Sequence, residues 1–170
     1  GNSFPTEVVK AMMLIRANVL TRGFSGVRLD TLMTLVDMIN EGISPVVPEY
    51  GSLGASGDLV PLAHVAIGLM GEGTVEFRGK LVSAQAAFEK AGIKPVKLSY
   101  KEGLALINGT SCMLALATLA IHDALNLVKT VDIVAAMTFE ALRGIVDSLD
   151  EKIHTLRVHP GQIHSACNIR

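Results

Sequence analysis

Residues 51–57 combine three glycines with a serine in a pattern that could carry unusual chemistry. Glycine reaches backbone conformations that a Cβ forbids, so this loop can turn tightly around Ala55 and Ser56. If the amide nitrogen of Gly57 is pressed against the carbonyl carbon of Ala55, it can add to that carbon. Loss of two water molecules, one of them from the Ser56 side chain, then leaves an unsaturated five-membered ring. The sequence Ala55-Ser56-Gly57 therefore predicts an electrophile made from the chain itself.

A helix is expected directly after this loop. Asp58 is a good N-cap, Leu59 begins the helix, and Pro61 falls in the first turn, where its missing N–H costs nothing. Gly71 marks the end. The loop would then lie at the positive end of a helix, which favours developing negative charge. The alternative is an ordinary glycine-rich loop capped by Asp58, and a bare Ala-Ser-Gly tripeptide would not exclude it.

A second candidate segment spans residues 101–110, which read KEGLALINGT. The carboxamide of Asn108 can donate and accept hydrogen bonds, so it can hold an amine or a carboxylate without titrating. The alternative is that Asn108 or Thr110 caps the helix that follows. Leu104 lies four residues before Asn108, on the same face if this turn is helical. For Leu104 and for Leu59, packing in the core is the alternative to lining a pocket.

The elements that must position these residues are mostly helical. Apolar residues at helical spacing, with caps and terminal glycines, predict a mainly α-helical bundle. One β-hairpin is expected over 74–82, around Arg78-Gly79. Helices are expected over about 6–22, 30–42, 59–71, 83–91, 111–128 and 130–147, with the last two forming an antiparallel pair that breaks at a Thr130 cap.

Composition narrows the class of protein. The 170 residues are 49% hydrophobic and 18% charged, with a net charge of -1, and this balance gives no reason to expect nucleic acid or an anionic membrane as partner. The uncharged run 103–121 approaches membrane-spanning length but contains several polar residues, which favours a buried bundle helix. The two cysteines form no Cys-x-x-Cys pair, so a reduced, cytoplasmic location is expected.

Other polar residues are expected to be structural. Arg16 and Asn18 are interpreted as a polar pair at a helix junction. His154, His159 and His164 recur every five residues, a spacing that fits neither one helix face nor the usual zinc ligand sets, so no metal site is predicted.

The run 51–64, GSLGASGDLVPLAH, resembles the signature of the ammonia-lyase and aminomutase family that builds the methylidene-imidazolone (MIO) group. This family includes histidine, phenylalanine and tyrosine ammonia-lyases. Segments 16–28, 101–110 and 157–162 resemble further parts of the same family, so the resemblance extends from about residue 8 to residue 162. It implies a helical fold similar to the aspartase and fumarase-like folds.

The resemblance also implies a chemistry. The MIO ring from Ala55, Ser56 and Gly57 would bind the amine of an α-amino acid and make it a leaving group, while a base removes a β-proton. No nucleotide, pyridoxal or metal would be needed. By this resemblance Asn108 contacts the prosthetic group and substrate, and Leu59 and Leu104 line the pocket for the substrate side chain.

The substrate is less well determined by these motifs. The run Pro61-Leu62-Ala63-His64 resembles histidine ammonia-lyases, whereas Asn108-Gly109-Thr110-Ser111 resembles the phenylalanine enzymes. Conversion of L-histidine to urocanate is the leading expectation. A phenylalanine or tyrosine ammonia-lyase, or an aminomutase, is the alternative.

The chain also departs from the family pattern. Family members are longer, with an essential tyrosine before the matched region and catalytic residues beyond it, and neither Tyr50 nor Tyr100 fits that role. Residues 1–170 are therefore expected to form a single MIO-bearing core domain, a fragment of a longer lyase with little activity alone. The family is tetrameric, so self-association is expected. An alternative of another class is a helical interaction module whose loop never cyclises.

Overall fold

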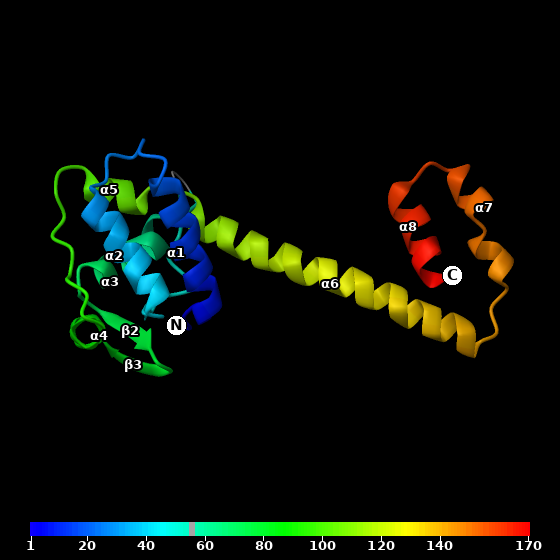
Figure 1. Cartoon of the computed structure of the whole chain (residues 1–170), viewed down its shortest axis with the longest axis horizontal. Coiled ribbons are helices and arrows are strands. Elements are labelled where there is room, and N and C mark those ends of the chain that lie inside the picture. The colour runs from blue at the N-terminus through cyan, green and yellow to red at the C-terminus, as the bar shows by residue number, and fades with distance from the viewer. Residues whose placement is uncertain (55–56) are drawn as a thin grey trace. The chain divides into compact units, whose positions relative to one another are not determined.

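The computed structural model describes residues 1–54 and 57–170. These residues form two compact units, 1–119 and 120–170, which are described separately (Figure 1). Helices dominate both units, as the sequence predicted. The expectation that residues 1–170 form a single domain stays a prediction.

Unit 1 is built on three helices, α1 (Thr6–Leu20), α2 (Leu29–Asn40) and α3 (Leu59–Leu69). Helix α1 packs on α2, and α3 packs on the short helix α5 (Glu102–Ile107). The helices meet in one apolar core, where burial of large side chains supplies the main stabilisation. Its largest buried members are Val9, Met12, Met13, Leu35, Met38, Ile43, Val47, Leu62, Leu69, Val75 and Phe88.

A small antiparallel sheet covers one end of unit 1 (Figure 1). The predicted hairpin is present as β2 (Thr74–Phe77) and β3 (Lys80–Ser83). Arg78 and Gly79 join the strands, both with positive φ, as a tight hairpin turn of this length prefers. A third strand, β1 (Ser44–Pro45), pairs with β2. The sequence indicated only an extended chain there, because its prolines do not specify a partner.

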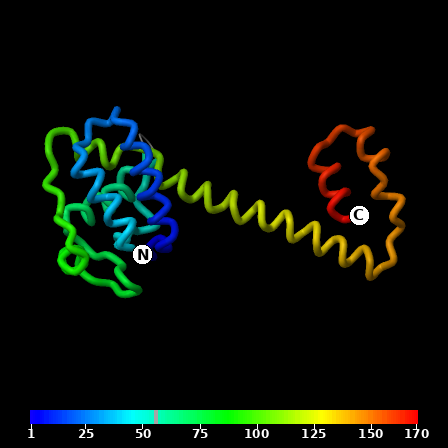
Figure 2. The backbone as a smooth tube through the Cα atoms, viewed as in Figure 1, coloured from blue at the N-terminus to red at the C-terminus, as the bar shows by residue number. Residues whose placement is uncertain are grey.

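Helix α4 (Ala84–Ala91) closes this end of unit 1 and has the predicted caps. Ser83 accepts a hydrogen bond from Ala86 N, and Gly92 ends the helix with φ +70°. The chain then runs along the outside of unit 1 to α5 (Figure 2). The amide of Val96 donates to Leu69 O at 3.1 Å, which ties this connection to the end of α3.

Helix α6 (Ser111–Ala141) replaces the predicted antiparallel pair. The prediction was wrong at Thr130, whose hydroxyl does not cap a new helix but donates to the carbonyl of Asn126, 2.9 Å away. Thr118 and Thr138 make the same i to i−4 bond. With no glycine or proline between residues 111 and 141, nothing breaks the backbone ladder, and a single helix results.

The end of α6 also differs from the predicted boundary near residue 147. The amide of Gly144 donates to Phe139 O and that of Arg143 to Glu140 O, which is the Schellman pattern. The left-handed residue is Arg143, with φ +52°, where a glycine is usual. The sequence signal for this end was therefore weak.

Most of α6 is solvent-exposed: of its residues only Ser111, Cys112, Ala115 and Asp132 are buried. The stretch Glu102–Ala141 contains an 18-residue window with a mean hydropathy of 1.9, so it is long and apolar enough to cross a membrane by length and composition, and 28% of that window is buried. The expectation of a buried bundle helix is not met by this chain alone. Cys112 and Ala115 pack in the core of unit 1, whereas the larger apolar side chains farther along α6 are exposed among the described residues.

Unit 2 consists of the second part of α6 with η1 (Val146–Leu149), α7 (Glu151–Thr155) and α8 (Pro160–Ile169). Asn168 of α8 donates a 2.7 Å hydrogen bond to Asp132 of α6. His154 lies against Ser148 O and Gln162, at 3.0 and 2.9 Å. Among the described residues, no three His, Cys, Asp or Glu side chains are grouped as metal ligands.

Candidate active site

Three residues are predicted to form the ring. The structure describes Gly57, whereas Ala55 and Ser56 lie outside the described residues. Its φ is +104°, a conformation that strains any residue with a Cβ. A Cβ on Gly57 would lie 2.7 Å from Gly109 O and 2.9 Å from Gly109 N. The loop and the Asn108-Gly109 segment are therefore packed backbone against backbone.

A hydrogen bond reinforces this contact. The amide of Asp58 donates to Gly109 O at 2.8 Å. The carbonyl of Gly109 thus faces both residues that end the loop. Residues more than fifty positions apart in the sequence become immediate neighbours, and Asn108, next to Gly109, is carried to the loop with them.

The side chain of Asp58 caps a different helix from the one predicted. Asp58 does precede α3, but its carboxylate makes no hydrogen bond to that helix. Instead its Oδ2 accepts from the amide of Met113, in the first turn of α6, at 2.8 Å. Ser52 Oγ lies 3.4 Å from the other oxygen. Asp58 therefore caps α6 by satisfying one of the free amides at its start. In the sequence, Asn108 or Thr110 was the alternative candidate for capping this helix.

Asn108 follows α5 directly and is exposed, as is Leu104, whose side chain is 54% exposed. The amide of Asn108 donates to Leu104 O at 2.9 Å, so the two residues share one helical turn as expected. Among the described residues none hydrogen-bonds to the Asn108 carboxamide. Leu59 is half-buried at the first position of α3. Neither Leu104 nor Leu59 is fully buried, so packing in the core does not completely explain the position of either residue.

Arg16 lies at a helix junction, as expected, but its partner is not the expected one. It does not pair with Asn18, which is exposed and contributes only its carbonyl, to Thr21. Arg16 is 4% exposed, and its Nη2 donates to Asn108 O at 2.9 Å and also to Ala105 O. Burial lowers the pKa of its guanidinium. The helix carrying Arg16 is thereby joined to the segment carrying Asn108.

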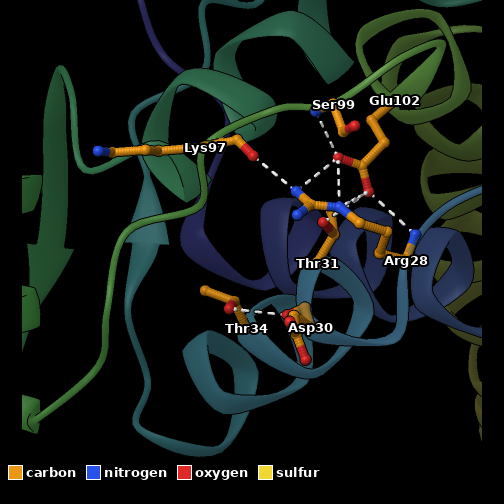
Figure 3. Close-up of polar contacts among 7 residues, drawn as sticks. All are labelled: Arg28, Asp30, Thr31, Thr34, Lys97, Ser99 and Glu102. Carbon is orange, nitrogen blue, oxygen red and sulfur yellow. Dashed lines mark hydrogen bonds and ion pairs between the residues drawn. The ribbon is translucent and has the colours of Figure 1, made fainter.

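Glu102, the first residue of α5, is a second group that sequence reasoning missed (Figure 3). Its side chain is 1% exposed and forms an ion pair of 2.8 Å with Arg28. The amide of Ser99 and the hydroxyl of Thr31 donate to it at 2.7 and 2.8 Å. Arg28 also donates to Lys97 O at 2.6 Å. These bonds hold the start of α5 against α2.

The carboxyl of Glu102 is strongly acidic for physical reasons visible in Figure 3. Burial by itself would raise its pKa, but hydrogen bonds from Arg28, Ser99 and Thr31 favour the charged form and lower the pKa to about 2. The only available sequence signal was an acidic residue at the head of the apolar run 103–107. That signal does not identify partners in other elements.

With this geometry known, comparison with known proteins identifies the family. The model of the family described as "Aromatic amino acid lyase" matches residues 1–170. The chain belongs to the aromatic amino acid lyase family. A histidine ammonia-lyase from Alkaliphilus oremlandii is 54% identical over 169 residues, 99% of this chain and 33% of that protein. The chain thus spans about a third of the length of the curated relatives it matches.

Solved structures of aromatic amino acid lyases share the fold. The histidine ammonia-lyase of Trypanosoma cruzi matches with a TM-score of 0.95 and 38% identity, over 100% of this chain and 34% of that one. The phenylalanine ammonia-lyase of Rhodosporidium toruloides matches with a TM-score of 0.94 and 42% identity, over 99% of this chain and 26% of that one. The predicted family and the mainly α-helical fold are confirmed.

The described part of the loop fits the prosthetic group expected in an aromatic amino acid lyase of the MIO type. Gly57 would supply the ring nitrogen, and its backbone is held by contacts that leave no room for a Cβ. Asp58 fixes the next residue at both its amide and its carboxylate. Both features restrict the end of the turn, which ring formation requires.

Proposed function

We propose that the intact protein is an ammonia-lyase that eliminates ammonia from L-histidine to give urocanate, and that this chain contains its electrophile-forming core. The supporting observation is the close backbone contact of Gly57 with Gly109, which joins the ring-forming sequence to Asn108. The relatives named histidine ammonia-lyase support the choice of substrate, at 54% identity for the one from Alkaliphilus oremlandii.

In this proposal Ala55, Ser56 and Gly57 form the MIO group without an external cofactor. The group supplies an electrophilic carbon that turns the amino group of the substrate into a leaving group. Asn108, exposed beside the loop, orients the substrate amine or carboxylate through its carboxamide. Leu104 and Leu59 provide apolar surface for the substrate side chain. Asp58 fixes the backbone through its amide and its carboxylate.

A phenylalanine or tyrosine substrate, or an aminomutase reaction, is the second candidate. The phenylalanine ammonia-lyase of Rhodosporidium toruloides supports it with 42% identity, as does the Asn108-Gly109-Thr110-Ser111 motif. A helical module without catalytic function is less favoured, because it gives no reason for the restricted backbone of Gly57.

The first test is the intact mass of the purified chain, compared with the mass calculated from its sequence. A deficit of two water molecules that disappears in Ser56→Ala supports ring formation. The full calculated mass in the folded chain would contradict ring formation in this core. The intact protein is then assayed with L-histidine and L-phenylalanine, and faster release of ammonia from phenylalanine would overturn the choice of substrate.

We also propose that the protein self-associates through α6. Leu125, Val131 and Met137 are each more than half exposed, which is unusual for such a run of large apolar side chains. Covering this surface with other copies of the chain would bury it. Light scattering should therefore give a mass above that of one chain, and a monomer at micromolar concentration would contradict the proposal.

A further inference from the structure

Arg16 is a buried cation without an anionic partner among the described residues, where the ion pair found is Arg28 with Glu102. Its Nη2 donates to two backbone carbonyls, and its Nε has no hydrogen-bond partner in the described part of the chain. Burying an arginine in this way costs free energy that an apolar side chain of similar size would not. Stability alone therefore does not account for Arg16.

The carbonyls that Arg16 holds are those of Ala105 and Asn108, at the end of α5. Carbonyls in the last turn of a helix lack partners within it, and a cation there is favourable. Because Arg16 extends from the well-packed helix α1, it joins the end of α5 to the rigid core. The backbone leaving α5 is thereby held in one place.

The next residue, Gly109, is enclosed on two sides. A Cβ built on Gly109 would collide with Nη1 of Arg16 and lie 3.2 Å from its Cζ. A Cβ built on Gly57 would in turn lie 2.7 Å from Gly109 O. The backbone of Gly109 therefore fills the space between the guanidinium and the end of the reactive loop.

We propose that Arg16 is a positioning residue for ring formation, because it fixes the Asn108-Gly109 backbone against which Gly57 is held. This inference rests on the proposed function. In the reaction the nitrogen of Gly57 forms a bond to the carbonyl carbon of Ala55. That carbonyl oxygen leaves as water with the amide protons of Gly57 and Ser56, and a C=N bond forms. The Ser56 hydroxyl leaves with the Cα proton as a second water, without any oxidant.

Arg16 acts only before this step, by limiting where Gly57 can move. Without Arg16 the end of α5 would lose its hydrogen bonds to α1 and would keep its packing against α3 and the bond from the Asp58 amide to Gly109 O. Gly109 could then move away from Gly57, and the position of the Gly57 nitrogen would no longer be restricted. The fold would survive, because the core residues of α1 are untouched.

The test compares Arg16→Met and Arg16→Lys with Arg22→Met in the full chain. Arg22 follows α1 on the surface and is a matched control. Intact mass measures the fraction that has lost two waters, and circular dichroism measures folding. We expect Arg16→Met to be folded but largely at full mass, Arg16→Lys to be intermediate, and Arg22→Met to equal the wild type. A two-water deficit as complete in folded Arg16→Met as in the wild type would overturn the proposal.

Hydrogen exchange gives a readout that does not depend on ring formation. The Asp58 amide is bonded to Gly109 O, so its exchange in Arg16→Met should rise by about tenfold relative to the Leu69 amide within α3, as expected for a lost bond to a charged donor. If Arg16→Met does not fold, the same exchange measurement is made on Arg16→Lys. Equal changes at both amides would mean a merely structural role for Arg16. A wild-type chain at full mass with the expected exchange pattern would instead count against ring formation in this core alone.

Discussion

Arginines hold both ends of α5, but in opposite ways. At the first residue, half-exposed Arg28 pairs with buried Glu102, whose carboxylate also accepts from Ser99 and Thr31. At the other end, buried Arg16 binds only backbone carbonyls. The first arrangement neutralises a buried charge, so breaking it should cost stability. The second leaves a buried charge unpaired, and its value lies in where it holds the backbone. We therefore expect the Arg28–Glu102 pair at the start of α5 to contribute mainly to stability, and Arg16 at its end mainly to hold the backbone in place.

The largest expected effect is that of Glu102→Ala. It leaves the Thr31 hydroxyl and the amides of Ser99 and Arg28 without their acceptor, and breaking a buried pair costs about 3–5 kcal/mol of unfolding free energy. Urea denaturation measures this, with Glu89→Ala on the exposed face of α4 as control. In contrast, Arg16→Met should change stability by less than about 1 kcal/mol, since an apolar residue of similar size replaces an unpaired charge. Equal losses of unfolding free energy in Glu102→Ala and Arg16→Met would contradict the distinction between a stabilising and a positioning arginine.

Low pH should also weaken the contacts that Glu102 makes at the start of α5. The pKa of Glu102 lies at about 2 in the folded chain, below its ordinary value of 4.5. A depressed pKa contributes stability that is present above 4.5 and is lost as the pH falls toward 2. The urea midpoint should therefore fall across this range, and the fall should be smaller in Glu102→Gln. An identical pH profile for both proteins would contradict the assignment.

A third prediction concerns the contact at the other end of α5. Gly57→Ala combines a positive φ with a backbone collision at 2.7 Å, which should cost about 3 kcal/mol. Gly54→Ala is the matched control, because its φ is +68° but nothing lies within 4 Å. It should cost about 1 kcal/mol. Thermal unfolding distinguishes the two, and equal shifts would mean that the contact with Gly109 is not tight.

The smallest effect is expected for Asp58→Asn. The amide side chain can still accept from Met113 N, but the charge near the start of α6 is lost, at a cost of about 1 kcal/mol. Burial, with a smaller contribution from Asp58, raises the pKa of the Cys112 thiol to about 11. At pH 8 a thiol reagent should therefore label Cys167 first. Faster labelling of Cys112 in Asp58→Asn than in the wild type would report the loss of the Asp58 charge beside this thiol, and unchanged labelling would argue against that interaction.

Much of the fold was predictable because its signals are local. Ser83 and Gly92 bound α4 as expected, and Arg78-Gly79 forms the hairpin turn. In each case the residue acts on backbone within four positions of itself. The continuous α6 was missed because a threonine hydroxyl can cap a new helix or bond back to the preceding turn. The sequence around Thr130 permits both.

The sequence indicated candidate residues for the site but not their connections. By itself the sequence determined the glycine-rich loop, the Asn-Gly-Thr segment, most of the helices and the family to which they belong. Tertiary structure alone decided that Asp58 caps α6, that Arg16 reaches Asn108, and that Glu102 receives Arg28. These partners are 55, 92 and 74 residues apart. The sequence around a polar side chain does not indicate which distant group that side chain will contact, because the packing of the apolar core determines which groups become neighbours.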